Sequence, residues 1–162
     1  MEAIRKSIEI RATADQVFTY LANPENDPEW VPSLMEVRNI SGSGSEMRYD
    51  WTYKMVGFKL DGETRTVEHV PSERLVVTTH GGVDSKWTYQ LTPTAEGTRF
   101  DLSVEYEIPL PVLGKLAEKL VARANEREVE VAIQNAKDQC EARAKDRSAA
   151  AGGAEPTHAT SP

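Results

Sequence analysis

The chain has 162 residues, of which 39% are hydrophobic and 28% are charged, enough for one domain with a real core and too few for two of ordinary size. The formal net charge of −7 argues against nucleic acid as a partner, because binding a phosphate backbone needs clustered Lys and Arg. Cys140 is the only cysteine, which excludes an internal disulfide, and no Cys/His spacing typical of a metal site is present.

Targeting and cofactor motifs are also missing from the sequence. The N-terminal sequence MEAIRKSIEI has no charged lead followed by an apolar run, and no stretch reaches the roughly 20 apolar residues of a membrane span. We therefore expect a cytoplasmic protein without a membrane span. No GxGxxG, GxxxxGKS/T, GxSxG or HExxH pattern occurs, so we expect no cofactor and no metal, and the enzyme classes that depend on these motifs are disfavoured.

The N-terminal part predicts a strand followed by a short helix. Isoleucines alternate with charged residues between residues 4 and 11, which is typical of a strand with one buried face. A helix is expected over residues 14–22, because Thr13 can act as its N-cap and Gln16 occupies the capping-box position. Residues 25–32 are rich in prolines and acids, so we expect a loop or a single helical turn there.

Six further strands are predicted between Leu34 and Ile108. Turn-forming residues separate them, including Ser-Gly-Ser-Gly, Gly-Gly and Pro-Ser-Glu sequences. Consecutive strands with short connections favour one antiparallel sheet of about seven strands. The expected ranges are about 34–41, 46–56, 58–70, 73–80, 83–93 and 97–108.

The C-terminal part predicts one long helix and a tail. From Leu113 to about Ala144 the sequence has no proline and is rich in Ala, Leu, Glu, Lys and Arg. At about 1.5 Å per residue, this helix would cross a whole sheet. Residues 147–162 carry no large apolar group, so we expect a domain over residues 1–146 and a disordered C-terminal tail.

This order of elements resembles the START/polyketide-cyclase (SRPBCC) superfamily, whose fold is called helix-grip. The segments that carry the resemblance are Ile8–Ala14 with Val17-Phe18, Asn23-Pro24 with Trp30, Pro71–Leu75 and Gly97-Thr98. The resemblance implies an α+β fold in which a curved antiparallel sheet grips the long helix, with one or two short helices after the first strand. It also implies a hydrophobic pocket between sheet and helix, while the activity stays open because relatives include cyclases, dehydratases, carriers and proteins that act through protein contacts.

Large aromatic residues recur at every second position of the predicted strands. Because period two places them on one face of the sheet, they should meet in the interior. They can fill a solid core or line a cavity, and we expect both uses. Phenol and indole rings combine apolar area with one hydrogen-bonding group, which suits a hydrophobic, partly oxygenated ligand. The pocket-lining candidates are Trp51, Tyr53, Trp87, Tyr89 and Tyr106, with Trp30 and Met55 near an entrance.

The apolar residues of the long helix fall on two faces. Leu120 and Ala124 belong to the first face and are ligand-binding candidates, whereas the second face starts at Val129. Asn125 and Glu128 lie at the changeover, so they can point into the pocket, where Glu128 would be a candidate acid/base or a hydrogen-bonding anchor. The alternative, which we favour, is that the helix bends and both side chains reach solvent or a neighbouring Arg.

Three functional hypotheses follow from these patterns. The first is non-enzymatic binding of a hydrophobic or aromatic small molecule, such as a lipid or a polyketide-like metabolite, by a carrier or sequestering protein. The second is a polyketide cyclase or dehydratase, in which Glu128 and a tyrosine hydroxyl move protons in the same cavity. The third is a protein–protein interaction module with a filled core. The absence of a catalytic grouping favours the first hypothesis.

Overall fold

The computed structural model describes residues 2–55, 57–107 and 114–152. The strands are β1 (Glu2–Ile10), β2 (Leu34–Ser41), β3 (Arg48–Met55), β4 (Phe58–Val70), β5 (Arg74–Gly81), β6 (Asp84–Pro93) and β7 (Thr98–Glu107). The helices are α1 (Ala14–Leu21), α2 (Asp27–Trp30) and α3 (Gly114–Gly152), with 3-10 turns η1 (Pro24–Asn26) and η2 (Gly44–Glu46). The strand boundaries agree with the predicted ranges to within two residues.

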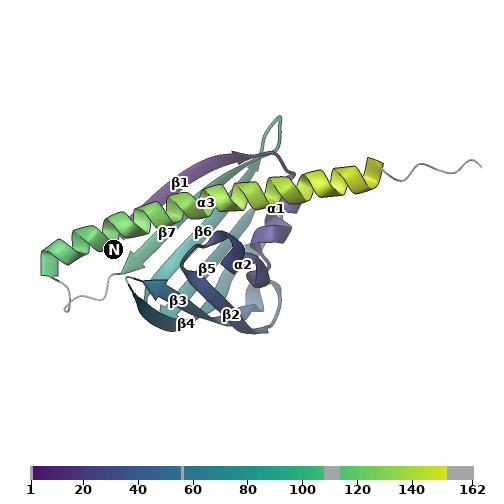
Figure 1. Ribbon diagram of the computed structural model, residues 1–162. Coiled ribbons are helices and arrows are strands. Elements are labelled where there is room, and N and C mark those ends of the chain that lie inside the picture. The colour runs from purple at the N-terminus through teal and green to yellow at the C-terminus, as the bar shows by residue number, and fades with distance from the viewer. Residues whose placement is uncertain (1, 56, 108–113, 153–162) are drawn as a thin grey trace, which may run out of the picture.

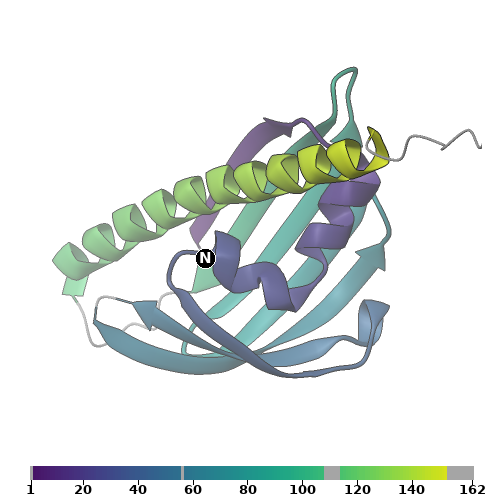
Figure 2. The ribbon, with the colours of Figure 1, turned by 45° about the vertical axis from the view of Figure 1, so that its right-hand side comes forward.

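All seven strands form one antiparallel sheet in the order β1-β7-β6-β5-β4-β3-β2. Strand pairing places Trp87 opposite Val104 and Tyr89 opposite Leu102, so the alternating rings do share one face. The sheet curves around α3, which crosses its concave side, and α1 and α2 lie on the same side (Figures 1 and 2). The predicted α+β helix-grip fold is confirmed.

Two short helical regions connect β1 to β2. The predicted capping box starts α1: Thr13 Oγ1 accepts from the Gln16 amide at 3.1 Å, and the Thr13 amide donates to Gln16 Oε1 at 3.0 Å. The segment expected to be a loop or a single turn contains η1 followed by α2. Trp30, the last residue of α2, is fully buried, so this short helix places an indole ring in the interior.

The helix α3 is longer than predicted. It continues to Gly152, whereas the sequence placed its end near Ala144 and a disordered tail from residue 147. The reason is local, since the sequence Ser-Ala-Ala-Ala at residues 148–151 favours a helix and the following glycines do not. The parts of the predictions that lie outside the described residues are Val56, Ile108, Leu113 and residues 153–162.

The buried face of α3 corrects one prediction. From residue 118 to residue 144 the helix has a single inward face, which includes Val121, Val129, Ala132, Ala136 and Cys140. The expected shift between two apolar faces is therefore absent from this part of α3. Leu120 is 62% exposed and Ala124 is also exposed, so neither faces the sheet. Neighbouring helix residues are 100° apart, so only one of two adjacent apolar residues can face the sheet. The sequence pattern suggested Leu120, whereas in the structure Val121 faces inward.

The interior has a solid part and a hollow part. Around the C-terminal end of β1, Ile10, Val17, Phe100 and Leu102 are almost completely buried, and they pack under the half of α3 that carries residues 132–140. None of these side chains lines the cavity described below, which lies further toward the start of α3. The interior is therefore solid under residues 132–140 of α3 and contains a cavity nearer the start of this helix.

Candidate functional site

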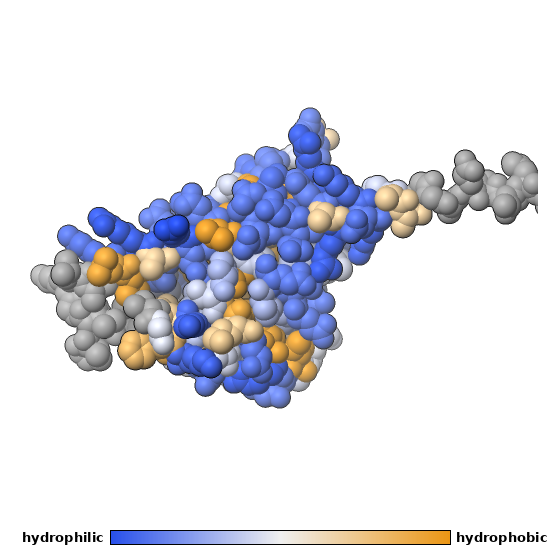
Figure 3. Space-filling view, viewed as in Figure 1, coloured by the Kyte–Doolittle hydropathy of each residue, from blue (hydrophilic) through white to orange (hydrophobic). Residues whose placement is uncertain are grey.

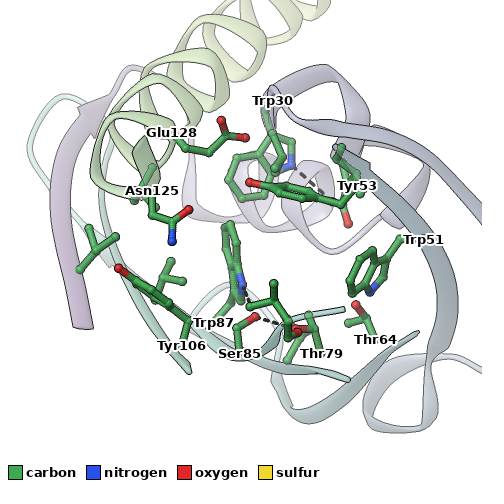
Figure 4. Close-up of a pocket in the computed structure, with 18 of the residues that line it drawn as sticks. Trp30, Trp51, Tyr53, Thr64, Thr79, Ser85, Trp87, Tyr106, Asn125 and Glu128 are labelled. Carbon is green, nitrogen blue, oxygen red and sulfur yellow. Dashed lines mark hydrogen bonds between the residues drawn. The ribbon is translucent and has the colours of Figure 1, made fainter. Parts of the chain in front are cut away.

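A partly open cavity lies between the sheet and the layer formed by α2 and α3. Every strand of the sheet contributes to its wall, and the cavity has a volume of about 120 Å³. The surface on the α3 side is mostly hydrophilic, with hydrophobic residues showing near the first described turns of α3 and below the helix (Figure 3). The wall itself is mainly apolar, and Figure 4 shows the polar groups that interrupt it.

The aromatic residues predicted from period two form much of this wall. All seven strand and turn candidates line the cavity: Trp30, Trp51, Tyr53, Met55, Trp87, Tyr89 and Tyr106. The rings meet edge to face, with centroid separations of 6.2 Å for Trp30–Trp87, 5.8 Å for Trp30–Tyr89 and 6.4 Å for Trp51–Tyr53. This arrangement suits the quadrupoles of the rings and holds them in place around the space. Leu120 and Ala124, the exposed candidates on α3, are not part of the wall.

Trp30 lies deeper than the sequence suggested. It was expected near an entrance, yet its side chain is 0% exposed and packs against the rings of Trp87 and Tyr89. Its backbone carbonyl accepts a hydrogen bond from Asn135 Nδ2 of α3 at 3.3 Å, which fixes α2 to the long helix. Met55, at the end of β3, is only partly buried and is better placed for the entrance.

The carboxyl group of Asp27 is a polar feature of the site that sequence reasoning missed. Asp27 is buried, with its oxygens accepting hydrogen bonds from Tyr49 Oη at 2.9 Å and from Trp30 Nε1 at 3.3 Å. Burial raises the pKa of Asp27 from its ordinary value of 3.8 to about 7, although the two hydrogen bonds act in the opposite direction. A carboxyl group with such a pKa can exchange a proton near neutral pH.

Asn125 and Glu128 are half-buried and line the cavity, whereas the favoured alternative had a helix bend turn both side chains to solvent or a neighbouring Arg. The Glu128 carboxylate accepts two hydrogen bonds of 2.8 Å from Ser33, one from the amide and one from Oγ. These bonds tie α3 to the residue just before β2. Burial and the neighbouring Glu128 carboxylate raise the pKa of Tyr53, whose ring lies below the carboxylate in Figure 4.

A chain of hydrogen bonds runs along the floor of the cavity. Trp87 Nε1 donates to Ser85 Oγ at 3.0 Å, Ser85 and Thr79 hydroxyls are 2.6 Å apart, and Thr79 Oγ1 donates to the Val83 carbonyl at 3.0 Å. Because the Thr79 proton goes to Val83, Ser85 must donate to Thr79 and accept from Trp87. Every hydroxyl in this chain has a partner within the protein.

Trp51 differs from the other two indoles. It is 6% exposed, and its Nε1 has no hydrogen-bond partner among the residues that the structure describes. Strand pairing places Trp51 opposite Gly62, and a Cβ at Gly62 would collide with Trp51 Cζ2. The glycine therefore allows the ring to lie against β4.

Metal sites and membrane-spanning helices are both absent from the described residues. No group of three or more His, Cys, Asp or Glu side chains in the described ranges is arranged to hold a metal ion. None of the described helices combines the length and the hydropathy needed to cross a membrane.

Comparison with known proteins gives a family and several related folds. A family model described as polyketide cyclase / dehydrase and lipid transport matches residues 1–141. The chain is similar to the crystal structure of TTHA0849 from Thermus thermophilus, with a TM-score of 0.78, 21% identity and coverage of 88% of this chain and 99% of that one. No match is found among curated protein sequences.

Two further solved structures share the fold. One is the di-domain ARO/CYC StfQ from the steffimycin biosynthetic pathway, with a TM-score of 0.71, 19% identity and coverage of 91% of this chain and 51% of that one. The other is Ara h 8.0201, with a TM-score of 0.62, 12% identity and coverage of 86% and 97%. At these identities the likeness concerns the fold alone.

Proposed function

This chain belongs to the polyketide cyclase / dehydrase and lipid transport family, and from this premise we propose that residues 1–146 bind a small hydrophobic or aromatic molecule as a carrier or sequestering protein. The binding site is the cavity between the sheet and α3. The observation that carries the proposal is the lining, in which three indoles and several phenols surround an open space. Concave, mainly apolar sites with a few polar groups are typical of small-molecule binding.

The size of the cavity limits the part of the ligand that it encloses. An apolar cavity of about 150 Å³ holds one benzene molecule, and the space here is about 120 Å³. The enclosed part is therefore about one ring or an alkyl segment of similar volume, and a second fused ring would extend toward the open side. A longer lipid or polyketide-like molecule would continue through the open side.

The hydrogen bonds of the lining hold the polar side chains of the cavity in place. Glu128, the predicted acid/base candidate, uses both carboxylate oxygens to hold Ser33. The hydroxyls of Ser85 and Thr79 are already linked to each other and to Trp87 and Val83. Groups that are paired in this way support the shape of the cavity, which the binding proposal requires.

A cyclase or dehydratase activity is the second candidate, and Asp27 is the observation that favours it. Its buried carboxyl lines the cavity, and its pKa of about 7 suits general acid–base chemistry. The fold is also that of an ARO/CYC from a biosynthetic pathway. Turnover of a polyketide-like substrate that is lost in Asp27→Asn and retained in Glu128→Gln would support this candidate in place of the carrier.

The experiment that tests the binding proposal uses Val104, which lines the cavity from β7 and is 4% exposed. Intrinsic tryptophan fluorescence is the readout, because all three tryptophans of the chain line the cavity. Titration with small aromatic compounds and fatty acids should give saturable changes. Val104→Phe should abolish them by filling the space, whereas Val104→Ile adds one methylene and should retain them. Absence of saturable binding across all classes would contradict the proposal.

The cellular setting and other partners belong to the same proposal. We place the protein in a reducing cytoplasm, in keeping with a single cysteine whose thiol is buried and whose pKa is raised by that burial to about 12. A protein partner is the alternative if no ligand binds, since an interaction module does not need a guest in the cavity. Nucleic acid is not a proposed partner, because the net charge is −7.

A further inference from the structure

A polar residue interrupts the apolar inward face of α3 where that face meets the cavity. Val121, Val129, Ala132 and Ala136 are all buried on this face. Asn125 lies one turn from both valines, so it belongs to the same face, and it lines the cavity. An inward asparagine is costly, because it is a poorer helix former than leucine or alanine and its amide loses water on partial burial. Its presence indicates a polar partner in the cavity.

Other polar groups of the lining already have partners in the protein. Asp27 and Glu128 each accept two hydrogen bonds, and Thr79 and Ser85 belong to the chain along the floor. In contrast, the Asn125 amide makes no hydrogen bond with another residue in the described part of the chain. Its nitrogen and oxygen are also accessible, since neither is among the buried side-chain atoms without a partner in that part. The amide can therefore pair with a guest.

The orientation of Asn125 brings this amide to the enclosed space. The residue is half-buried, and Figure 4 shows its amide end directed into the cavity, toward the rings of Tyr106 and Trp87. Both rings line the same space. A guest ring that lies against these side chains would thus have its edge within reach of the amide.

The charges around the cavity exclude an anionic partner. The described lining contains two carboxyl groups, Asp27 and Glu128, and no Lys or Arg. Glu128 is also the next residue along the helix face from Asn125, because residues three apart are neighbours on a helix. A guest carboxylate or phosphate would lose its hydration and meet a like charge without gaining a cation. The partner of Asn125 is therefore a neutral group.

The chemistry of the amide distinguishes between neutral groups. A side-chain amide has an acceptor oxygen and two N–H donors, so a hydroxyl group can pair with either end. A carbonyl group can pair only with the N–H end, and the negative end of its dipole would then lie near the Glu128 carboxylate. A hydroxyl group can turn its hydrogen toward that carboxylate instead. Among neutral groups, a hydroxyl fits this part of the lining best.

We propose that Asn125 binds a neutral hydroxyl group, that of an alcohol or a phenol, on an otherwise apolar ring system held in the cavity. This inference rests on the proposed binding function and adds the chemical class of the guest. The hydrogen bond would orient the ring system, with its hydroxyl group under α3 and its apolar part among the rings of the sheet.

The test uses three probes that share one ring system: indane, 1-indanol and 1-indanone. Their dissociation constants are measured by isothermal titration with the wild-type protein, Asn125→Leu and Asn135→Leu. Both substitutions remove a half-buried asparagine amide from α3, but Asn135 donates to the Trp30 carbonyl at 3.3 Å and does not line the cavity. Dividing each affinity by that of indane in the same protein cancels changes in cavity volume and the different hydration of the probes.

The expected result is that Asn125→Leu lowers the affinity for 1-indanol, relative to indane, by about three- to tenfold, the effect of one net hydrogen bond. The relative affinity for 1-indanone should change less. In Asn135→Leu both ratios should stay near the wild-type values. Asn125→Leu should fold, because leucine is the better helix former and no partner in the described part of the chain is lost.

A second readout needs no variant protein for its result. The side-chain NH₂ signals of Asn125 in the NMR spectrum of the wild-type protein should move further downfield with 1-indanol than with indane. This measurement remains informative if either variant fails to fold.

The outcomes separate this inference from the binding proposal. Binding of indane and 1-indanol with the same ratio in wild type and Asn125→Leu, or Asn125 signals that do not distinguish these probes, would overturn the role of Asn125 and leave binding intact. A loss in Asn125→Leu that is as large for 1-indanone as for 1-indanol would overturn the preference for a hydroxyl group. Failure of the wild-type protein to bind any probe would count against the binding proposal and overturn this inference with it.

Discussion

Replacement of Asp27 by Asn should change the pH dependence of stability more than any other single substitution at the cavity. The wild-type carboxyl has an ordinary pKa of 3.8 in the unfolded chain and a pKa of about 7 in the folded protein. Between these values the folded state holds a proton that the unfolded state has released. The free energy of unfolding therefore falls as pH rises from about 4 to about 7, and this contribution is constant above that window.

The magnitude follows from the size of the shift. The pKa is raised by about three pH units, and each unit corresponds to about 1.4 kcal/mol, so ionisation of Asp27 costs the folded state about 4 kcal/mol at pH 8. In the described part of the chain, the groups that shift this pKa include no Lys or Arg to offset the charge; Tyr49 and Trp30 donate the two hydrogen bonds, and Tyr89 also lies within reach of the charge. The substitution Asp27→Asn keeps the shape of the side chain and removes its charge.

Urea unfolding followed by tryptophan fluorescence is the assay, at about pH 4.5, near the acid end of the window, and at about pH 8.5, above the window. Relative to wild type, Asp27→Asn should gain about 3 kcal/mol of stability between these two pH values, because part of the contribution of about 4 kcal/mol is already lost at pH 4.5. A pH-independent offset from the altered hydrogen bonds with Tyr49 and Trp30 does not affect this difference. Asp146→Asn removes one carboxylate from an exposed site on α3 and serves as the control. Parallel pH profiles for wild type and Asp27→Asn would refute the reasoning.

Three further tests concern single contacts, two of them at the cavity and one at the start of α1. A double-mutant cycle with Glu128→Gln and Ser33→Ala should give a coupling free energy of about 1–3 kcal/mol in chemical denaturation, because Ser33→Ala removes the hydroxyl that donates to the charged carboxylate and keeps the backbone amide, and additive effects would contradict the bond from Ser33 Oγ. Gly62→Ala should lower stability by about 1–3 kcal/mol and alter the emission of Trp51, since the new Cβ collides with the indole, and an unchanged spectrum would show that the ring is not held there. Thr13→Ala should cost about 1 kcal/mol by removing the N-cap of α1, measured as a lower thermal midpoint, whereas Thr13→Ser should retain most of the stability.

The parts of the site that lie on strands could be predicted from the sequence. The alternation of Trp51 with Tyr53 and of Trp87 with Tyr89 fixes which rings share a face, since a strand has only two faces. The hydrogen-bond register then brings residues far apart in the chain to one wall. The alternation does not show whether the space in front of that face is filled by a core or left as a cavity, because a core and an apolar cavity need the same kinds of side chain.

The polar residues of the site were harder to predict, each for a physical reason. Asp27 lies in a helix of four residues, where neither the period of a helix nor that of a strand can be read. Glu128 and Asn125 are polar residues on an inward helix face, and the sequence alone cannot show that Ser33 supplies partners for the carboxylate. Leu120 was misplaced because its neighbour Val121 is equally apolar and lies 100° away.

The central claim, that the cavity takes up an apolar guest, is tested most directly by the indole N–H NMR signals of Trp30, Trp51 and Trp87 during titration with indane. These are the three tryptophans of the chain, and all of them line the cavity. The account predicts that all three signals shift and saturate together, and that none shifts in Val104→Phe. Signals that stay unchanged up to the solubility limit of indane, or that shift equally in Val104→Phe, would contradict it.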